Sequence, residues 1–285
     1  MKRTLIIASL VLCACNQTNA PKKATHPPID PSTVVALGPD TFSEGFDGGV
    51  QGPNGSNWWV NEMPSHDVTL SAFTIDASEV TVSKYATFLA MAGGVGHWAA
   101  SMPISVGATT QDFTAVPGTE SVAMYDVTWF DARAYCLWMG GDLPTEAQWE
   151  YAAKNTNIGQ IYPWGTSGPA CDQANFFTGD VTCELGPIDA GSYSPAGDTP
   201  QGIHDLAGNV AEWTFDVYSA YTTDAEMDPS GPDADVYGDA AATELRVIRG
   251  GGYRDVPISL RTTNRYGADA ALRSKGVGFR CAYGS

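Results

Sequence analysis

The sequence contains few basic residues and few histidines. Its 285 residues include 15 Lys and Arg against 32 Asp and Glu, with four His, and the formal net charge is −17. Proteins bind nucleic acids largely by neutralising phosphates with Lys and Arg, so this acidity excludes nucleic acid as a partner. The four histidines are scattered and there is no CxxC motif, so the chain offers no zinc site of the usual kind.

The basic residues are concentrated towards the C-terminal end. From Arg246 onward the chain carries eight of its fifteen Lys and Arg but only two acidic residues, Asp255 and Asp269, whereas the part before it is strongly acidic. This asymmetry predicts either many ion pairs between the two parts or a basic pocket in an acidic shell. The length suits one or two domains, and a hydrophobic content of 43% is enough for a packed core.

The first residues are typical of an export signal. Lys2 and Arg3 precede an apolar stretch, residues 5–12, that is too short to span a bilayer. Residues 12–15, Leu-Cys-Ala-Cys, are similar to a bacterial lipobox, in which cleavage before Cys15 would leave a cysteine that carries lipid. We therefore expect a lipoprotein signal peptide at 1–14. The alternative is an ordinary cleaved signal that ends near Ala20.

The region after Cys15 predicts a tether. Residues 16–40 are rich in Pro, Thr and small polar residues and lack apolar periodicity, so we expect a flexible lipid-anchored linker at 15–33 and a folded domain at 34–285. Residue 16 is Asn rather than the Asp that favours retention in the inner membrane of enterobacteria. The expected location is therefore the bacterial cell envelope, anchored through lipid in the outer membrane.

Apolar periodicity and capping residues predict one strand and three helices. Thr81 and Thr128 are expected N-caps, and Thr145 with Gln148 forms a capping box on local grounds alone. Glycine pairs follow the first two helices and are expected to end them. The expected elements are a strand over 66–76 and helices over 82–91, over 129–139 and from 146 onward.

The stretch from His204 to Trp213 is a candidate site for a hard cation. Asp205 and Glu212 lie seven positions apart, and Gly208 and Asn209 between them tolerate positive φ, so the backbone can turn its carbonyls inward. Two carboxylates and inward carbonyls form an all-oxygen environment, which suits Ca²⁺. The alternative is a solvated turn in which the Asp side chain caps a backbone N–H.

Several segments in the same order resemble the formylglycine-generating enzyme, or sulfatase-modifying factor, family. The resemblance covers about residues 34–282 and implies the fold of that family: α+β, distantly C-type-lectin-like, with little regular secondary structure, stabilised by calcium and disulfides. The segment at 143–153 is the most specific of them, although Asp142 stands where the family usually has Arg. The matching segments read EVT at 79–81, DVTWFDARAYC at 126–136, LPTEAQWEYAA at 143–153, YPWG at 162–165, DLAGNVAEW at 205–213, RVIRGGGY at 246–253 and GFRCA at 278–282.

The resemblance also implies two structural calcium sites. One would use the turn described above, and the other would use the Asn side chain of the family's "AN" motif with a downstream Asp. For Asn175 the alternative is an amide that caps a turn. The candidate ligands are Asp205, Gly208, Val210 and Glu212 for the first site, and Asn175 and Asp180 for the second.

Apart from Cys15, four cysteines remain after the signal peptide, an even number in a protein expected outside the cytoplasm, where disulfides persist. Four cysteines allow three pairings, and reduced thiols are the alternative. The resemblance implies that Cys136 pairs with Cys281, because these positions pair in animal members of the family. That leaves Cys171 for Cys183.

The residues on which formylglycine formation depends in this family are missing. The family uses two cysteines in the segment after its "RGGS" motif to bind copper(I), which prefers thiolate ligands. Here residues 253–265 contain no cysteine, Gly252 replaces the active-site Ser, and Gly276 replaces an Asn. We therefore expect no copper and no formylglycine formation, although an oxidative activity by another route stays open.

Arginines crowd the segment that replaces the catalytic one. Arg binds carboxylates and phosphates in bidentate fashion, and Tyr offers a flat face, so the cleft is expected to bind an anionic ligand or an extended peptide. The alternative is that these arginines form ion pairs with the acidic part of the chain. The candidate cleft residues are Arg249, Gly252, Tyr253, Arg254, Arg261 and Arg265.

Together these observations predict an exported lipoprotein, non-catalytic or repurposed, that binds a peptide or anionic partner. The alternative function is that of an oxidoreductase that converts a client cysteine to formylglycine. A related oxidative activity associated with nonheme iron is a further alternative.

Overall fold

The computed structural model describes residues 26, 28–47, 59–92, 94–109, 111–154, 159–231 and 244–284. The expected signal peptide, Cys15 and most of the expected linker lie outside these residues. Among the residues described, no helix is both long and apolar enough to cross a membrane.

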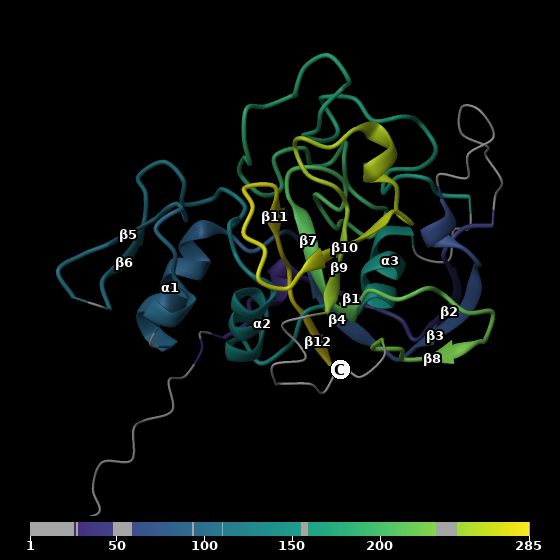
Figure 1. The fold of residues 1–285 in the computed structure, drawn as a ribbon, viewed down its shortest axis with the longest axis horizontal. Helices are drawn as coiled ribbons and strands as arrows, with labels where there is room; N and C mark the ends of the chain where they lie inside the picture. Colours follow the sequence, from purple (N-terminus) through teal and green to yellow (C-terminus); the bar gives the residue numbers. More distant parts are fainter. Residues whose placement is uncertain are drawn as a thin grey trace, which may run out of the picture.

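The described residues form three short helices, four small sheets and much irregular backbone (Figure 1). The helices are α1 (Val82–Ala92), α2 (Trp129–Trp138) and α3 (Glu146–Lys154), and there are short 3₁₀ turns at Pro31–Thr33, Val60–Glu62, Gly94–His97 and Pro257–Leu260. The strands are β1 (Val34–Leu37), β2 (Asp40–Glu44), β3 (His66–Leu70), β4 (Phe73–Asp76), β5 (Ile104–Val106), β6 (Phe113–Ala115), β7 (Ala211–Val217), β8 (Glu226–Met227), β9 (Leu245–Arg249), β10 (Arg265–Asp269), β11 (Val277–Gly278) and β12 (Ala282–Gly284).

Strands that are far apart in the sequence meet in each larger sheet. The strand orders are β1-β4-β12, β10-β9-β7-β11 and β2-β3-β8, with β5 and β6 forming a separate hairpin. In Figure 1, helix α3 lies between the β10-β9-β7 strands and the β2-β3 strands, and all of its residues except the half-buried Gln148 are buried. The expected α+β character, with few helices, is confirmed.

The local signals for helices are confirmed. The Thr128 hydroxyl accepts the N–H of Asp131, and the Asp131 carboxylate accepts the N–H of Thr128, which completes a capping box at α2. Thr145 and Gln148 make the same reciprocal pair of bonds at the start of α3. These caps use the backbone N–H groups that a helix leaves without partners at its first turn.

The single strand expected over 66–76 is two strands. β3 ends at Leu70 and pairs with β2 and β8, whereas β4 begins at Phe73 and pairs with β1 and β12. The break lies at Ser71, whose N–H and hydroxyl both donate to the carboxylate of Asp228. The two residues between β3 and β4 belong to neither strand, and this break lets Leu70 and Phe73 both face the core. The alternation of apolar and polar residues therefore shifts between the two strands.

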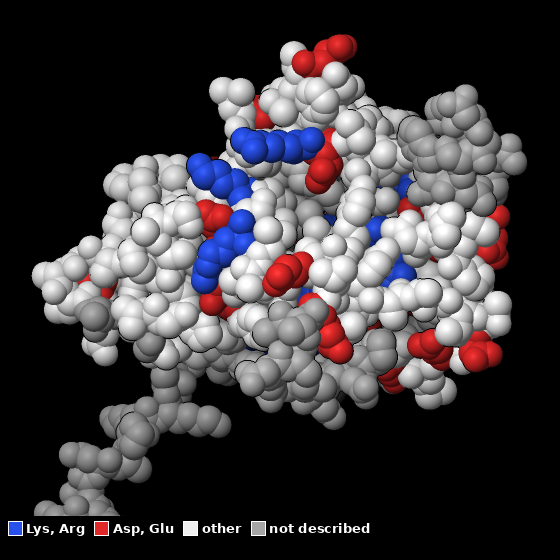
Figure 2. All heavy atoms as spheres, in the orientation of Figure 1, with Lys and Arg blue, Asp and Glu red and all other residues white. Residues whose placement is uncertain are grey.

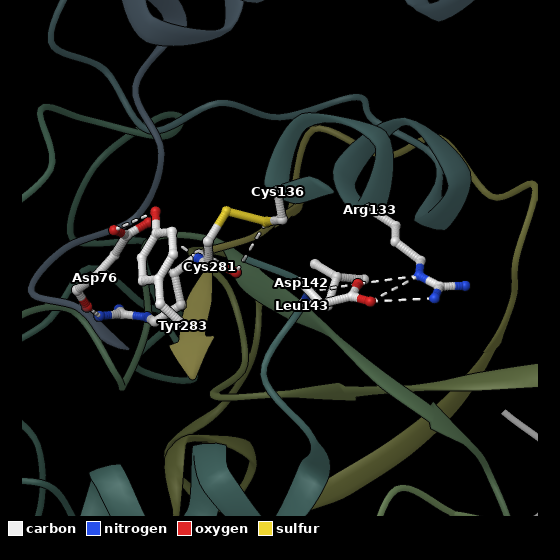
Figure 3. The surroundings of a disulfide bond; sticks show 8 residues. Asp76, Arg133, Cys136, Asp142, Leu143, Cys281 and Tyr283 are labelled. Atoms are coloured by element: carbon white, nitrogen blue, oxygen red, sulfur yellow. Dashed lines mark hydrogen bonds and ion pairs between the residues drawn. A yellow bond between two sulfur atoms is a disulfide. The ribbon is translucent and has the colours of Figure 1, made fainter. Parts of the chain in front are cut away.

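Both disulfides expected from the resemblance are present. Cys136 on α2 bonds to Cys281, which is 145 residues away, and Cys171 bonds to Cys183 within one loop. Beside the first bridge, the Cys281 N–H and the Tyr283 hydroxyl both donate to the buried carboxylate of Asp76 (Figure 3). The bridge therefore joins α2 to the segment that leads into β12.

Asp142, where the family usually has Arg, has an ion-pair partner. The Nε atom of Arg133 lies 3.0 Å from Asp142 Oδ1, and its Nη2 lies 3.1 Å from Oδ2 (Figure 3). The pair links α2 to the strand-like segment before α3, so the departure from the family pattern is accommodated locally.

Candidate functional site

The turn between His204 and Trp213 has the expected left-handed backbone. Gly208 has φ +87° and Asn209 has φ +60°. Gly208 also lies against another chain segment, because a Cβ there would be 2.4 Å from the carbonyl oxygen of Asn175. The Asn209 N–H donates to that same carbonyl at 2.8 Å. The two stretches expected to hold calcium are thus adjacent.

The carboxylate of Glu212 is fully buried and paired. Its Oε1 accepts Arg280 Nη2 at 2.7 Å, and its Oε2 accepts Arg280 Nε at 2.7 Å and Trp149 Nε1 at 2.8 Å. Asp205 is also buried and accepts the N–H of Gly191. Burial raises the pKa of Asp205 above its ordinary value. A cation at this turn would share Glu212 with Arg280.

A third carboxylate, Glu79, supports the turn and was not among the expected ligands. Its side chain is fully buried and accepts Asn209 Nδ2 at 2.8 Å and the Val210 N–H at 3.2 Å. Burial, followed by the nearby charges of Asp205 and Glu212, raises the pKa of Glu79 well above its ordinary value. Glu79 thereby fixes the backbone that carries two of the expected ligands.

In the second expected calcium site, both polar atoms of the Asn175 side chain make hydrogen bonds within the protein. The Asn175 amide donates from Nδ2 to the Gly186 carbonyl at 2.9 Å, and its Oδ1 accepts the Glu184 N–H at 3.1 Å. Asp180 is exposed at the far end of the same loop. In the described part of the chain no group of three or more His, Cys, Asp and Glu side chains is placed to hold a metal ion. Calcium would therefore depend mainly on backbone carbonyls.

Arg249 and Arg265 lie in the interior rather than in an open cleft. Arg249 Nη2 is 2.5 Å from Glu150 Oε2 and its Nε is 3.0 Å from Glu146 Oε1, while Arg265 makes two bonds to Glu146 at 2.7 and 2.5 Å. Although burial acts to raise it, Lys154 and Arg249 lower the pKa of Glu150 to about 2. These arginines neutralise buried acids, which is the alternative interpretation given above.

Arg261 is also buried in an ion pair. Both of its terminal nitrogens donate to the carboxylate of Glu62, and Thr263 and Asn264 donate to the same group. Its guanidinium carbon lies 3.2 Å from the ring centroid of Trp59. The prediction that Arg249, Arg261 and Arg265 present free charges to a ligand is therefore wrong, because all three are committed to buried glutamates.

The positions of the family's Ser and Asn are packed against each other. A Cβ on Gly252 would lie 2.7 Å from the carbonyl oxygen of Gly276. Tyr253 is buried, and its N–H donates to the Asn209 carbonyl at 2.9 Å. Every cysteine among the described residues is in a disulfide, so none offers a thiolate for copper(I).

Two exposed basic residues lie beside these glycines in the sequence. Arg254 and Lys275 are exposed, and Arg273 is half-buried and pairs with Asp131 at 2.7 Å. The face of the molecule that carries the C-terminal loops has several Lys and Arg side chains gathered on it (Figure 2). Of the expected cleft residues, only Arg254 is therefore available to a partner in solution.

Comparison with known proteins identifies the fold. The profile of the "Sulfatase-modifying factor enzyme 1-like domain" matches residues 18–284. The chain belongs to this family. The formylglycine-generating enzyme of Streptomyces coelicolor is 31% identical over 88% of this chain and 87% of its own. The bovine "Inactive C-alpha-formylglycine-generating enzyme 2" is 35% identical over 56% of this chain and 49% of its own.

Family members also occur within larger proteins. The Chlamydia trachomatis serine/threonine-protein kinase Pkn1 is 32% identical over 78% of this chain, but the match covers only 35% of the kinase. The chain thus spans about a third of the length of the chlamydial relatives that it matches. The solved structure of Treponema denticola variable protein 1 superposes with a TM-score of 0.62, at 20% identity over 88% of this chain and 94% of that one. At that identity it supports the family fold alone.

Proposed function

We propose that this protein is an exported, lipid-anchored member of the family that binds a partner and does not form formylglycine. The observation that carries the proposal is the contact between Gly252 and Gly276, where the family's Ser and Asn would stand. The Ser hydroxyl, the Asn amide and the thiolate pair that the resemblance leads us to expect are all missing from their positions in this chain, and all described cysteines are in disulfides. A relative described as inactive lies within the same family. Export and lipid attachment rest on the signal-like residues that end at Cys15.

The partner we propose is an anionic or extended peptide that docks beside the two glycines. Arg254 and Lys275 are exposed there, and the half-buried ring of Tyr125 lies near Tyr253. Exposed cations attract an acidic chain over about 10 Å at 0.1 M salt. Binding should therefore weaken as ionic strength rises.

We also propose that calcium stabilises the fold, which we regard as distantly related to C-type lectins. The support is the adjacency of Asn175 and Gly208 and the set of buried acids around the turn, in which Glu79, Asp205 and Glu212 face a single guanidinium, that of Arg280. A divalent cation would offset the excess negative charge. Its role would be structural, because Asn175 and Glu212 are both buried from solvent.

The second candidate function is formylglycine formation. It is favoured by the 31% identity to the Streptomyces coelicolor enzyme, which extends over nearly the whole of both chains. Copper-dependent oxygen uptake with a Cys-x-Pro-x-Arg peptide distinguishes the two. We expect no uptake above the rate without protein, and turnover would overturn the proposal. A match at 29% identity to a hercynine oxygenase keeps nonheme-iron chemistry as a further alternative, tested by the same assay with added Fe²⁺.

The binding proposal is tested with a fluorescein-labelled decaglutamate peptide and its decaglutamine counterpart. We expect the protein to bind the acidic peptide more tightly, and we expect Arg254→Ala with Lys275→Ala to weaken that binding at least tenfold. Lys84→Ala, an exposed basic residue on α1, is the matched control and should leave binding unchanged. Equal binding of both peptides, or an equal effect of Lys84→Ala, would count against this surface.

A further inference from the structure

A cavity of about 430 Å³ lies away from the two glycines, between the first turn of α3, the end of β7 and the β2-β3-β8 sheet. Four separate parts of the chain contribute carboxylates to its wall, and no residue of the peptide surface proposed above takes part. The residues that decide its chemistry are Glu44, His66, Glu146, Asp216, Tyr221 and Arg265.

The wall has more negative than positive charge. Glu44, Glu146 and Asp216 are 3%, 4% and 5% exposed, respectively. The cations next to them are shared, because Arg265 pairs with Glu146, Arg249 pairs with both Glu146 and Glu150, and Lys154 pairs with Glu150 at 2.5 Å. Glu44 faces His66 at 3.4 Å, and this contact raises the pKa of His66. Asp216, by contrast, has no ion-pair partner among the described residues.

Two buried side chains at the cavity have polar atoms to spare. Asp216 accepts the Glu146 N–H through Oδ2 at 2.6 Å, and no hydrogen bond to its Oδ1 is found among the described residues. His66 is 6% exposed, and its Nε2 faces Glu44 at 3.4 Å, but its Nδ1 has no hydrogen-bond partner of ordinary geometry. A buried polar atom without a partner destabilises the fold, and a ligand in the cavity would supply one.

We propose that this cavity binds a small organic cation that carries a primary ammonium group, with Asp216 as its main counter-ion. An ammonium group donates three hydrogen bonds, and the carboxylates of Asp216 and Glu44 offer acceptors. A metal ion fits less well, since no three His, Cys, Asp or Glu side chains in the described ranges converge on one point. The volume is at the lower end of the range for ligand pockets, which suits a short alkylamine or a lysine side chain.

The protonation of Asp216 gives the proposal a distinctive signature. Burial, followed by the charge of Glu146, raises the pKa of Asp216 well above its ordinary value, and Glu44 acts in the same direction. Opposing them are the Glu146 N–H and Arg265, and Arg246 also lies within electrostatic range. Burial therefore opposes the ionisation of Asp216, and an ammonium ion that enters the cavity should promote the loss of its proton.

Calorimetry of the full-length chain with Nα-acetyl-lysine methylamide, cadaverine and 1-butanol tests the proposal. We expect both amines to bind and butanol to bind at least tenfold more weakly. Comparison of buffers with different ionisation enthalpies should show that a proton is released on binding. A preference for the lysine derivative would indicate a peptide side chain as the natural ligand, and a preference for cadaverine would indicate a free amine.

Asp216→Asn keeps an acceptor for the Glu146 N–H, so it should fold, and it should weaken amine binding at least tenfold and abolish proton release. Glu226→Gln, at an exposed position on the cavity wall, should weaken amine binding two- to threefold. This variant tests the proposal if Asp216→Asn fails to fold. Asp172→Asn, an exposed carboxylate that does not line the cavity, is the control. Equal binding of butanol and amines, or unchanged binding in both cavity variants, would overturn the proposal.

Discussion

The alpha carbon of Gly252 faces the carbonyl oxygen of Gly276 so closely that a Cβ on Gly252 would approach this oxygen to 2.7 Å. The resemblance to the family implies Ser and Asn at these two positions. The two replacements therefore lie in contact in this fold. Restoring the serine alone does not rebuild the original site, because backbone from the segment of Gly276 occupies the space.

Gly252→Ser is accordingly predicted to destabilise the fold without restoring oxygen uptake. Inserting a side chain into a filled space costs about 1–3 kcal/mol, because the neighbours must shift. Urea denaturation should show this loss. Gly168→Ser is the matched control, since a Cβ at Gly168 meets no neighbour within 4 Å and the residue has no left-handed φ. Equal stability of the two variants would contradict the packing argument.

The buried pair of Glu62 and Arg261 yields a second prediction. Removing one member of a buried ion pair leaves an uncompensated charge and costs about 3–5 kcal/mol, whereas replacing both with apolar residues is much less harmful. Arg261→Leu and Glu62→Leu should each be strongly destabilising, and the double variant should be more stable than the sum of the two losses predicts. Arg254→Leu, at an exposed position, should change the free energy of unfolding by less than about 0.5 kcal/mol.

A third prediction concerns Asp76, beside the Cys136–Cys281 disulfide. Burial raises the pKa of Asp76 to about 6, against an ordinary value of 3.8. The folded state therefore holds this proton more tightly than the unfolded state, so the proton's contribution to stability is present below about pH 4 and is lost as pH rises through 6. A shift of this size corresponds to about 3 kcal/mol.

Asp76→Asn should flatten this part of the stability curve, because Asn keeps an acceptor for the Cys281 N–H but does not titrate. Chemical denaturation between pH 4 and 8 measures the difference. Asp67→Asn, an exposed residue on β3, should follow the unchanged protein throughout. If the Asp76 variant shows the same pH dependence as the parent, the raised pKa is refuted.

The proposed calcium gives a fourth prediction. A ligand present at a hundred times its dissociation constant stabilises the folded state by about 2.7 kcal/mol, so EGTA should lower the Tm and added Ca²⁺ should restore it. Mg²⁺ should restore it less well, because it demands a smaller and more regular shell of oxygens. A Tm that does not change when EGTA is added would contradict the proposal that calcium stabilises this fold.

The local features could be predicted from sequence because their causes are local. The capping boxes at Thr128 and Thr145 and the left-handed backbone at Gly208 and Asn209 each depend on residues within a few positions. The two disulfides needed the family resemblance in addition, since four cysteines alone allow three pairings. The split of the expected strand at Ser71 was missed because its cause, Asp228, lies 157 residues away.

The arginines show most clearly what could not be predicted from the sequence. Charge asymmetry predicted that basic and acidic parts would meet, but it could not say which arginine meets which acid. Arg249 meets Glu150 across 99 residues, and Arg261 meets Glu62 across 199. No local pattern in the sequence indicates which residues pair over such separations. An arginine in a buried ion pair and an arginine in an open binding cleft therefore look the same in the sequence. Glu79 was missed for the same reason, because it supports Asn209 across 130 residues.

The disulfide between Cys136 and Cys281 determines how cleavage of the backbone between them would appear in electrophoresis. Any single cut in the backbone between those residues leaves two fragments that stay covalently joined. The exposed loop around Leu185, whose side chain is 94% accessible, is one place where a protease could make such a cut. A nicked molecule would therefore migrate as one species in an electrophoresis gel until a reductant separates its pieces.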